Sequence, residues 1–232
     1  MCGRLSLTST DHRAAAGLIA GLIPRFDAPS LGAWLERSGY HARYNVGPGQ
    51  DHWVVRARDH RPILARASWG LPGGKGQLII NARAETVSER PMFRAGFNHD
   101  RCLVVADGFF EWDRSGARPQ PWWFRDAADR GLLFAAVLTE GRFAVVTVPA
   151  NPDVERFHSR MPAIIDTSVH ERWLYGSAAD ARPLLHSPPP GGLRSTAVSR
   201  RINSIEHDDP ACVEPVELAS PPASQLSLIE PG

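Results

Sequence analysis

Apolar residues in the middle of the chain come in short runs that Gly, Pro, Asp and Arg interrupt. Apolar runs of this length between turn-forming residues are typical of β-strands. The pattern predicts strands at residues 53–57, 63–68, 78–80, 102–106, 122–124, 132–138 and 143–148. The middle of the protein is therefore predicted to be mostly strand.

Two segments have a helical pattern instead. In residues 11–23, the alanines and Leu18, Ile19 and Leu22 recur at helical spacing, Ser9 and Thr10 stand where an N-cap is expected, and Pro24 follows. Residues 168–175 are predicted as a further helix and residues 182–193 as a loop. We expect one domain over residues 1–219 and a flexible tail rich in Pro, Ser and Ala over residues 220–232.

Composition excludes several classes of protein. The 232 residues are 43% hydrophobic, so the chain can bury a core, and a disordered or collagen-like chain is excluded. No apolar run approaches the roughly 18 residues that span a membrane, and the first residues do not resemble a signal peptide. We expect a cytoplasmic protein without membrane insertion. Cys2, Cys102 and Cys212 form no Cys-x-x-Cys pair, which indicates a reducing compartment and no structural metal.

The charge of the chain adds little to the prediction of its function. Residues 1–125 carry 17 Lys and Arg against 11 Asp and Glu, whereas residues 126–232 carry 9 against 14. All basic residues except Lys75 are arginine, the side chain that binds phosphate bidentately. A GC-rich genome would produce the same bias, so charge alone does not predict a nucleic-acid partner.

Cys2 is the first candidate for chemistry. If Met1 is removed, this residue carries a thiol beside an α-amine whose usual pKa is near 7.7–8.0. Such an amine forms a Schiff base with an aldehyde, and the thiol can then close a five-membered thiazolidine on the same carbon. The alternative is a buried, inert cysteine.

Three further segments combine polar groups with a constrained environment. Asn81 and Arg83 follow an apolar run and share one face of a predicted strand, so both can address one ligand unless they lie on a solvated edge. Glu111 stands among aromatic residues, which would desolvate its carboxylate and suit general acid–base chemistry, unless it points outward. His158 lies in a Pro-bounded turn, where it is either a proton shuttle or simply exposed.

Five motifs occur in one order along the chain: MCGR at 1–4, RYNVGPG at 43–49, NARAET at 81–86, DGFFEW at 107–112 and HSRMP at 158–162. In these motifs the sequence closely resembles the SRAP family, the SOS-response-associated peptidases or abasic-site processing proteins. The resemblance extends to about residue 215. It implies an α+β fold, a single domain built on a β-barrel-like, mostly antiparallel sheet with a few flanking helices.

The resemblance also implies an activity, namely protection of abasic sites in single-stranded DNA by a covalent DNA–protein cross-link in the DNA damage response. Cys2 would be the nucleophile, Asn81 would position it, and Glu111 and His158 would transfer protons. The implied DNA contacts are Arg4, Arg83, Pro48, Thr147 and Arg160. Single-stranded DNA with an abasic site is the implied partner of a monomer without cofactor or metal.

One loop departs from the family pattern. Many relatives carry an aromatic loop after the strand that ends in Trp-Gly, but here Trp69-Gly70 leads into LPGGKG. Stacking of an aromatic side chain on a base is worth about 1–3 kcal/mol, so contacts with flanking DNA would depend on Lys75, Met92 and Phe93.

Two other functions stay open from the sequence. One is a thiol peptidase with Cys2 as nucleophile, His158 as base and Glu111 as orienting group, for which removal of its own Met1 could be the only cleavage. The other is a non-catalytic module that binds nucleic acid through its basic N-terminal half.

Overall fold

The structure is a computed structural model that describes residues 3–218. Its largest element is a seven-stranded sheet with the order β11–β8–β3–β4–β12–β13, in which β7 also pairs with β12. β11 pairs with β12 as well, so within the described residues the path returns on itself and forms a barrel-like ring. The strands are β3 (Asp51–Arg58), β4 (Arg61–Trp69), β7 (Asn81–Arg83), β8 (Arg101–Ala106), β11 (Leu132–Thr139), β12 (Arg142–Pro149) and β13 (Arg160–Pro162).

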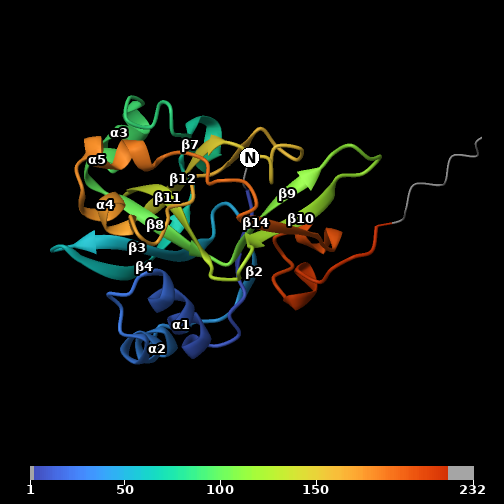
Figure 1. Ribbon diagram of the computed structural model, residues 1–232, viewed down its shortest axis with the longest axis horizontal. Coiled ribbons are helices and arrows are strands. Elements are labelled where there is room, and N and C mark those ends of the chain that lie inside the picture. The colour runs from blue at the N-terminus through green and yellow to red at the C-terminus, as the bar shows by residue number, and fades with distance from the viewer. Residues whose placement is uncertain (1–2, 219–232) are drawn as a thin grey trace, which may run out of the picture.

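A second sheet has the order β14–β10–β9–β1–β2 and is antiparallel throughout. Its strands are β1 (Leu5–Leu7), β2 (Arg43–Val46), β9 (Gly108–Asp113), β10 (Gln120–Asp126) and β14 (Leu193–Ala197), and the short strands β5 (Leu71–Pro72) and β6 (Leu78–Ile79) pair separately. The β9–β10 hairpin projects away from the ring (Figure 1). Only the pairings of β12 with β4 and β7 are parallel among the described strands, so the expected α+β, mostly antiparallel architecture is confirmed.

Helices flank the sheets. They are α1 (His12–Leu22), α2 (Ala28–Arg37), α3 (Pro91–His99), α4 (His170–Tyr175) and α5 (Ala178–Ala181). Figure 1 shows α1 and α2 together below β3 and β4, with α3, α4 and α5 at the other end of the ring. None of the described helices is long and apolar enough to cross a membrane.

The first helix is confirmed, but its predicted cap is wrong. Asp11, not Ser9 or Thr10, caps α1, because its carboxylate accepts hydrogen bonds from the backbone N–H groups of Arg13 and Ala14. The helix ends at Leu22, with Ile23 as C-cap before Pro24. The predicted tail at 220–232 lies outside the described residues.

The core fills the ring and continues under the flanking helices and the second sheet. All of β8 and most of β11 are buried, which explains why residues 102–106 and 132–138 are continuous apolar runs instead of alternating ones. Stacked aromatic rings, such as Phe109 and Phe124 with centroids 5.1 Å apart, fill the space between the two sheets. A smaller cluster contains Phe110, Trp123, Val198, Ile202 and Cys212 and attaches the C-terminal segment to the second sheet.

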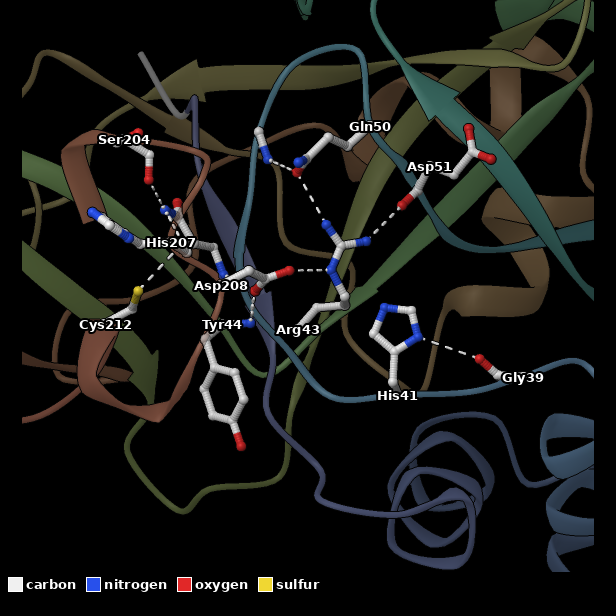
Figure 2. Close-up of polar contacts among 12 residues, drawn as sticks. Gly39, His41, Arg43, Tyr44, Gln50, Asp51, Ser204, His207, Asp208 and Cys212 are labelled. Carbon is white, nitrogen blue, oxygen red and sulfur yellow. Dashed lines mark hydrogen bonds and ion pairs between the residues drawn. The ribbon is translucent and has the colours of Figure 1, made fainter. Parts of the chain in front are cut away.

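The C-terminal segment, residues 199–213, is fixed to β2 by polar contacts (Figure 2). The Asp208 carboxylate accepts hydrogen bonds from the backbone N–H groups of Tyr44, at 2.5 Å, and Asn45, at 2.8 Å, and forms an ion pair with Arg43. Arg43 also donates to the side-chain oxygen of Gln50 at 3.0 Å, and that oxygen accepts the Gly47 N–H. The RYNVGPG motif therefore joins β2, the following loop and the C-terminal segment.

Candidate active site

Asn81 and Arg83 lie on β7, beside β12. The parallel register places Asn81 opposite Val145 and Arg83 opposite Thr147. A cavity of about 580 Å³ opens between β7, β12 and the start of α3. Its lining is Ile79, Asn81, Arg83, Thr86, Arg90, Pro91, Met92, Phe93 and Thr147. The structure thus brings the predicted Asn81, Arg83, Thr147, Met92 and Phe93 to one cavity.

Glu111 lies on β9 and is 4% exposed. Its cross-strand neighbour on β10 is Trp122. Burial raises the pKa of the Glu111 carboxyl, and the positive charge of Arg114 partly opposes that rise. The side chain therefore has the desolvated setting that its aromatic neighbours indicated, and its catalytic role stays a prediction.

His158 lies just before β13 and is partly buried. Its Nδ1 accepts a hydrogen bond from the backbone N–H of Arg160 at 2.9 Å. Burial lowers the pKa of His158, and the positive charges of Arg114 and Arg160 lower it further. The imidazole is therefore mostly neutral at physiological pH.

An aromatic contact joins the surroundings of Glu111 and His158. The ring of Trp122 lies 5.4 Å from that of Phe157, which directly precedes His158. The Arg156 guanidinium covers this pair, 5.0 Å from the Trp122 centroid and 4.3 Å from that of Phe157. The positive charge of Arg114 lowers the pKa of both Glu111 and His158, so both groups lie within the range of the same charge.

Arg160 connects this region to the cavity beside β7. Its guanidinium binds the Glu85 carboxylate through two contacts, of 2.5 Å and 2.9 Å, and also donates to the Thr147 carbonyl. Its side chain is only 15% exposed. These contacts favour a positioning role over the predicted phosphate contact, which stays a prediction.

The DGFFEW motif fixes the N-terminal strand against β9. The Asp107 carboxylate accepts hydrogen bonds from the hydroxyls of Ser6 and Thr8, each at 2.6 Å. Gly108 leaves room for Trp123, because a Cβ there would lie 2.2 Å from the indole nitrogen. The pairing of Leu5 with Phe109 continues as a 3.2 Å hydrogen bond from the Phe110 N–H to the Arg4 carbonyl.

Arg4 and Pro48 lie at the other side of this strand. The Arg4 guanidinium donates to the Asn203 carbonyl at 3.3 Å and lies against Gly47, the neighbour of Pro48. The Asn203 side chain accepts a 2.8 Å hydrogen bond from the Trp112 indole. The C-terminal segment thus forms part of the surroundings of Arg4. Cys2 lies outside the described residues.

The residues expected to replace the aromatic loop are not equivalent. Lys75 is in an exposed turn, Gly74–Gly76, and is not one of the described residues that line the cavity. Phe93 is 5% exposed, so its ring packs mainly inward, whereas Met92 is 40% exposed. Of these two side chains, Met92 therefore offers the larger accessible apolar surface.

Sequence reasoning missed three residues that surround the site, namely Glu85, Arg114 and Arg156. Glu85 lies inside the NARAET motif and Arg114 closely follows DGFFEW, so their proximity to a motif could have identified them as site residues. Arg156 gave no such signal, because its aromatic partner Trp122 is on a distant strand. Among residues 3–218, no cluster of three or more His, Cys, Asp or Glu side chains could hold a metal ion.

Solved structures share the fold of this chain. A crystal structure of a protein from Bacteroides thetaiotaomicron matches with a TM-score of 0.74 and 21% identity, covering 93% of this chain and all of that one. A phage-related protein from Bordetella bronchiseptica matches with a TM-score of 0.66 and 24% identity, over 86% of this chain and 95% of that one. These matches define the fold class.

A family model described as SOS response associated peptidase (SRAP) matches residues 1–205, and the chain belongs to this family. The resemblance seen in the five motifs is therefore confirmed. The chain is 29% identical to the abasic site processing protein YoqW of Bacillus subtilis (strain 168), over 92% of this chain and 99% of the relative. It is 27% identical to YedK of Escherichia coli (strain K12), over 93% and 100%, and 27% identical to HMCES of Gallus gallus, over 81% and 70%. Both of these relatives are also named abasic site processing proteins.

Proposed function

We propose that the protein processes abasic sites in single-stranded DNA by forming a covalent cross-link through Cys2. The observation that carries this proposal is the position of Glu111. Its buried carboxyl, with a raised pKa, lies on β9 one residue beyond the point where Phe110 pairs with Arg4. The residues at the N-terminal end of β1 therefore lie beside β9 near Glu111. Cys2 precedes the first described residue, Gly3. The names of the relatives support the same function.

The proposed reaction has three steps. The abasic sugar opens when its C1′–O4′ bond breaks, giving a C1′ aldehyde and a hydroxyl at C4′. After removal of Met1, the α-amine of Cys2 adds to the aldehyde, and loss of water gives a Schiff base. The thiol then adds to the same carbon while its proton passes to the nitrogen, which closes the thiazolidine. The proton transfers need a group that exchanges protons near neutral pH, and the environment of Glu111 suits it to this task.

The cavity beside β7 supplies the binding part of the proposal. Asn81 would orient the polar groups of the sugar or of Cys2, and the buried Thr147 would line the pocket behind it. Arg83 is exposed at its rim and would bind a phosphate next to the lesion, as would Arg4. The apolar surface of Met92 would contact a neighbouring base.

Intact mass spectrometry with a single-stranded abasic oligonucleotide tests this proposal. We expect a covalent adduct that survives heating and maps to Cys2, and the buried Cys102 and Cys212 are the internal comparison. In Cys2→Ser the amine remains but ring closure is lost, so only a reversible, reducible Schiff base should form. A heat-stable adduct from Cys2→Ser would refute the thiazolidine. A cleaved peptide without an adduct would indicate the peptidase, and binding without either product would indicate the non-catalytic module.

A further inference from the structure

His158 has a hydrogen-bonding arrangement that restricts what it can do in the site. Its Nδ1 lies 2.9 Å from the backbone nitrogen of Arg160 and 3.2 Å from the carbonyl oxygen of the same residue. A backbone nitrogen always carries its hydrogen, and this N–H has Nδ1 as a well-placed acceptor. Nδ1 could either accept a hydrogen bond from this N–H or donate one to the carbonyl oxygen. Because the Arg160 N–H is satisfied only while Nδ1 presents a lone pair, the contact at 2.9 Å favours Nδ1 as the acceptor. A neutral imidazole must then carry its proton on Nε2.

The backbone of Arg160 is held from both sides. Its side chain donates hydrogen bonds to the Glu85 carboxylate and the Thr147 carbonyl, as described above. Its main chain pairs with Pro149 in the β12–β13 ladder, and the Ala150 N–H donates to the carbonyl of Ser159 at 3.0 Å. The N–H of Arg160 therefore keeps a fixed direction toward His158.

The charges around His158 act in the same sense. Arg114 from the β9–β10 hairpin and Arg160 from β13 both oppose a positive imidazole. The Glu85 carboxylate is bound to Arg160, and no carboxylate accepts a hydrogen bond from His158 among residues 3–218. A catalytic triad has the opposite arrangement, because there the orienting group accepts the Nδ1 proton and leaves Nε2 free as a base.

On the basis of the function proposed above, we infer that the Glu85–Arg160 ion pair fixes His158 as the neutral Nε2–H tautomer, which serves the sugar as a hydrogen-bond donor. Glu85 and Arg160 are then positioning residues. Proton transfer falls to Glu111, which takes the proton from the C1′ hydroxyl and returns it to O4′ as the C1′–O4′ bond breaks. The proton count is unchanged in this step, and His158 gives up no proton.

The first experiment measures the tautomer directly. In protein labelled with ¹⁵N at the imidazole rings, the chemical shifts of the two His158 nitrogens distinguish the protonated atom from the bare one, and His158→Gln identifies the signals by their loss. We expect Nε2 protonated and Nδ1 bare in the free protein at neutral pH. A proton on Nδ1 would overturn the inference, whether or not the protein forms an adduct with DNA.

The second experiment separates donation from proton acceptance. The amide of His158→Gln can replace an Nε2–H donor but cannot act as a base, whereas His158→Ala can do neither. With folding checked by circular dichroism, we expect His158→Gln to keep a single-turnover cross-linking rate within about tenfold of wild type. We expect His158→Ala to lose on the order of 100-fold, as is typical when one hydrogen-bond donor to a reacting group is removed. Equal losses in the two variants would overturn the donor role.

The third experiment tests the positioning residues. Glu85→Gln removes the charge that holds Arg160, and Glu89→Gln is its control, because Glu89 is an exposed carboxylate four residues away with no ion pair among the described residues. We expect Glu85→Gln to populate the Nδ1–H tautomer and to change the pH dependence of the cross-linking rate. Glu89→Gln should change neither. An unaltered tautomer in Glu85→Gln would exclude a positioning role for this ion pair. Failure of wild-type protein to form any adduct would instead refute the proposed function.

Discussion

Asn45→Ala should release the C-terminal segment from β2. Asn45 is fully buried, and its Nδ2 donates to three backbone carbonyls, those of Ile202 at 3.2 Å, Ser204 at 2.8 Å and His207 at 2.8 Å. An amide nitrogen has two hydrogens, so three contacts share two donors. Alanine removes both donors, so the three carbonyls lose their hydrogen bonds from residue 45.

The expected cost follows from this geometry. A typical hydrogen bond contributes about 1 kcal/mol net, and leaving a buried partner unsatisfied costs about 1–3 kcal/mol. Because Ser204 and His207 are partly exposed and water can reach their carbonyls, the lower part of that range applies to them. We expect Asn45→Ala to lower the free energy of unfolding by about 2–4 kcal/mol, a large share of the roughly 5–15 kcal/mol that stabilises a typical domain.

Urea denaturation measures this loss, with the exposed Asn98→Ala as the matched control. Hydrogen exchange should show faster exchange in residues 199–213 of Asn45→Ala than in the control. Cross-linking should also slow under conditions where the variant is folded, since the segment carries the Asn203 carbonyl that holds Arg4. A loss below about 0.5 kcal/mol, with unchanged exchange, would refute the reasoning that this amide anchors the segment.

Two further predictions concern charge. Glu111→Gln should raise the free energy of unfolding at pH 7 while slowing cross-linking. A carboxyl whose pKa burial raises favours the folded state below its unfolded pKa and loses that contribution as the pH rises through its folded pKa. The gain should therefore shrink as the pH falls toward about 4, and a constant gain at all pH values would contradict this account. Arg83→Ala should weaken binding to all single-stranded sequences alike and reduce the salt dependence by about one ion, whereas Arg94→Ala on α3, outside the cavity lining, is the control. If the salt dependence of binding is unchanged in Arg83→Ala, Arg83 does not contact a DNA phosphate.

The strands of the ring could be predicted because buried strands consist of apolar residues, and such runs are visible in the sequence. In β8 and β11 both faces are covered, so residues 102–106 and 132–138 are apolar without interruption. Helix α3 could not be predicted, because its buried face consists mainly of Phe93 and Phe97, with Gly96 beside them. Glycine there looks like a helix breaker, yet a Cβ would lie 2.7 Å from the carbonyl oxygen of Leu138, so close packing on β11 requires it.

The candidate site was predictable as a set of residue types, but not as an arrangement. Asn81 and Arg83 share a face of one strand, which follows from local geometry alone. The pairing of Glu85 with Arg160 joins residues 75 positions apart, and it depends on β12 lying between β7 and β13. The hydrogen bond from Arg160 to His158 is local, but its direction depends on that same long-range pairing.

This arrangement bears on the two activities that the family's names suggest. A thiol peptidase needs an imidazole that accepts the proton of its nucleophile, and a carboxylate or amide usually holds the other ring nitrogen for that purpose. In this chain that nitrogen receives a backbone N–H, and the carboxylate of Glu85 is occupied by Arg160. A buried Glu111 can exchange protons with a sugar hydroxyl, and a neutral imidazole can donate to one. The chemistry of an aldehyde-forming sugar therefore fits these two side chains better than the cleavage of a peptide bond.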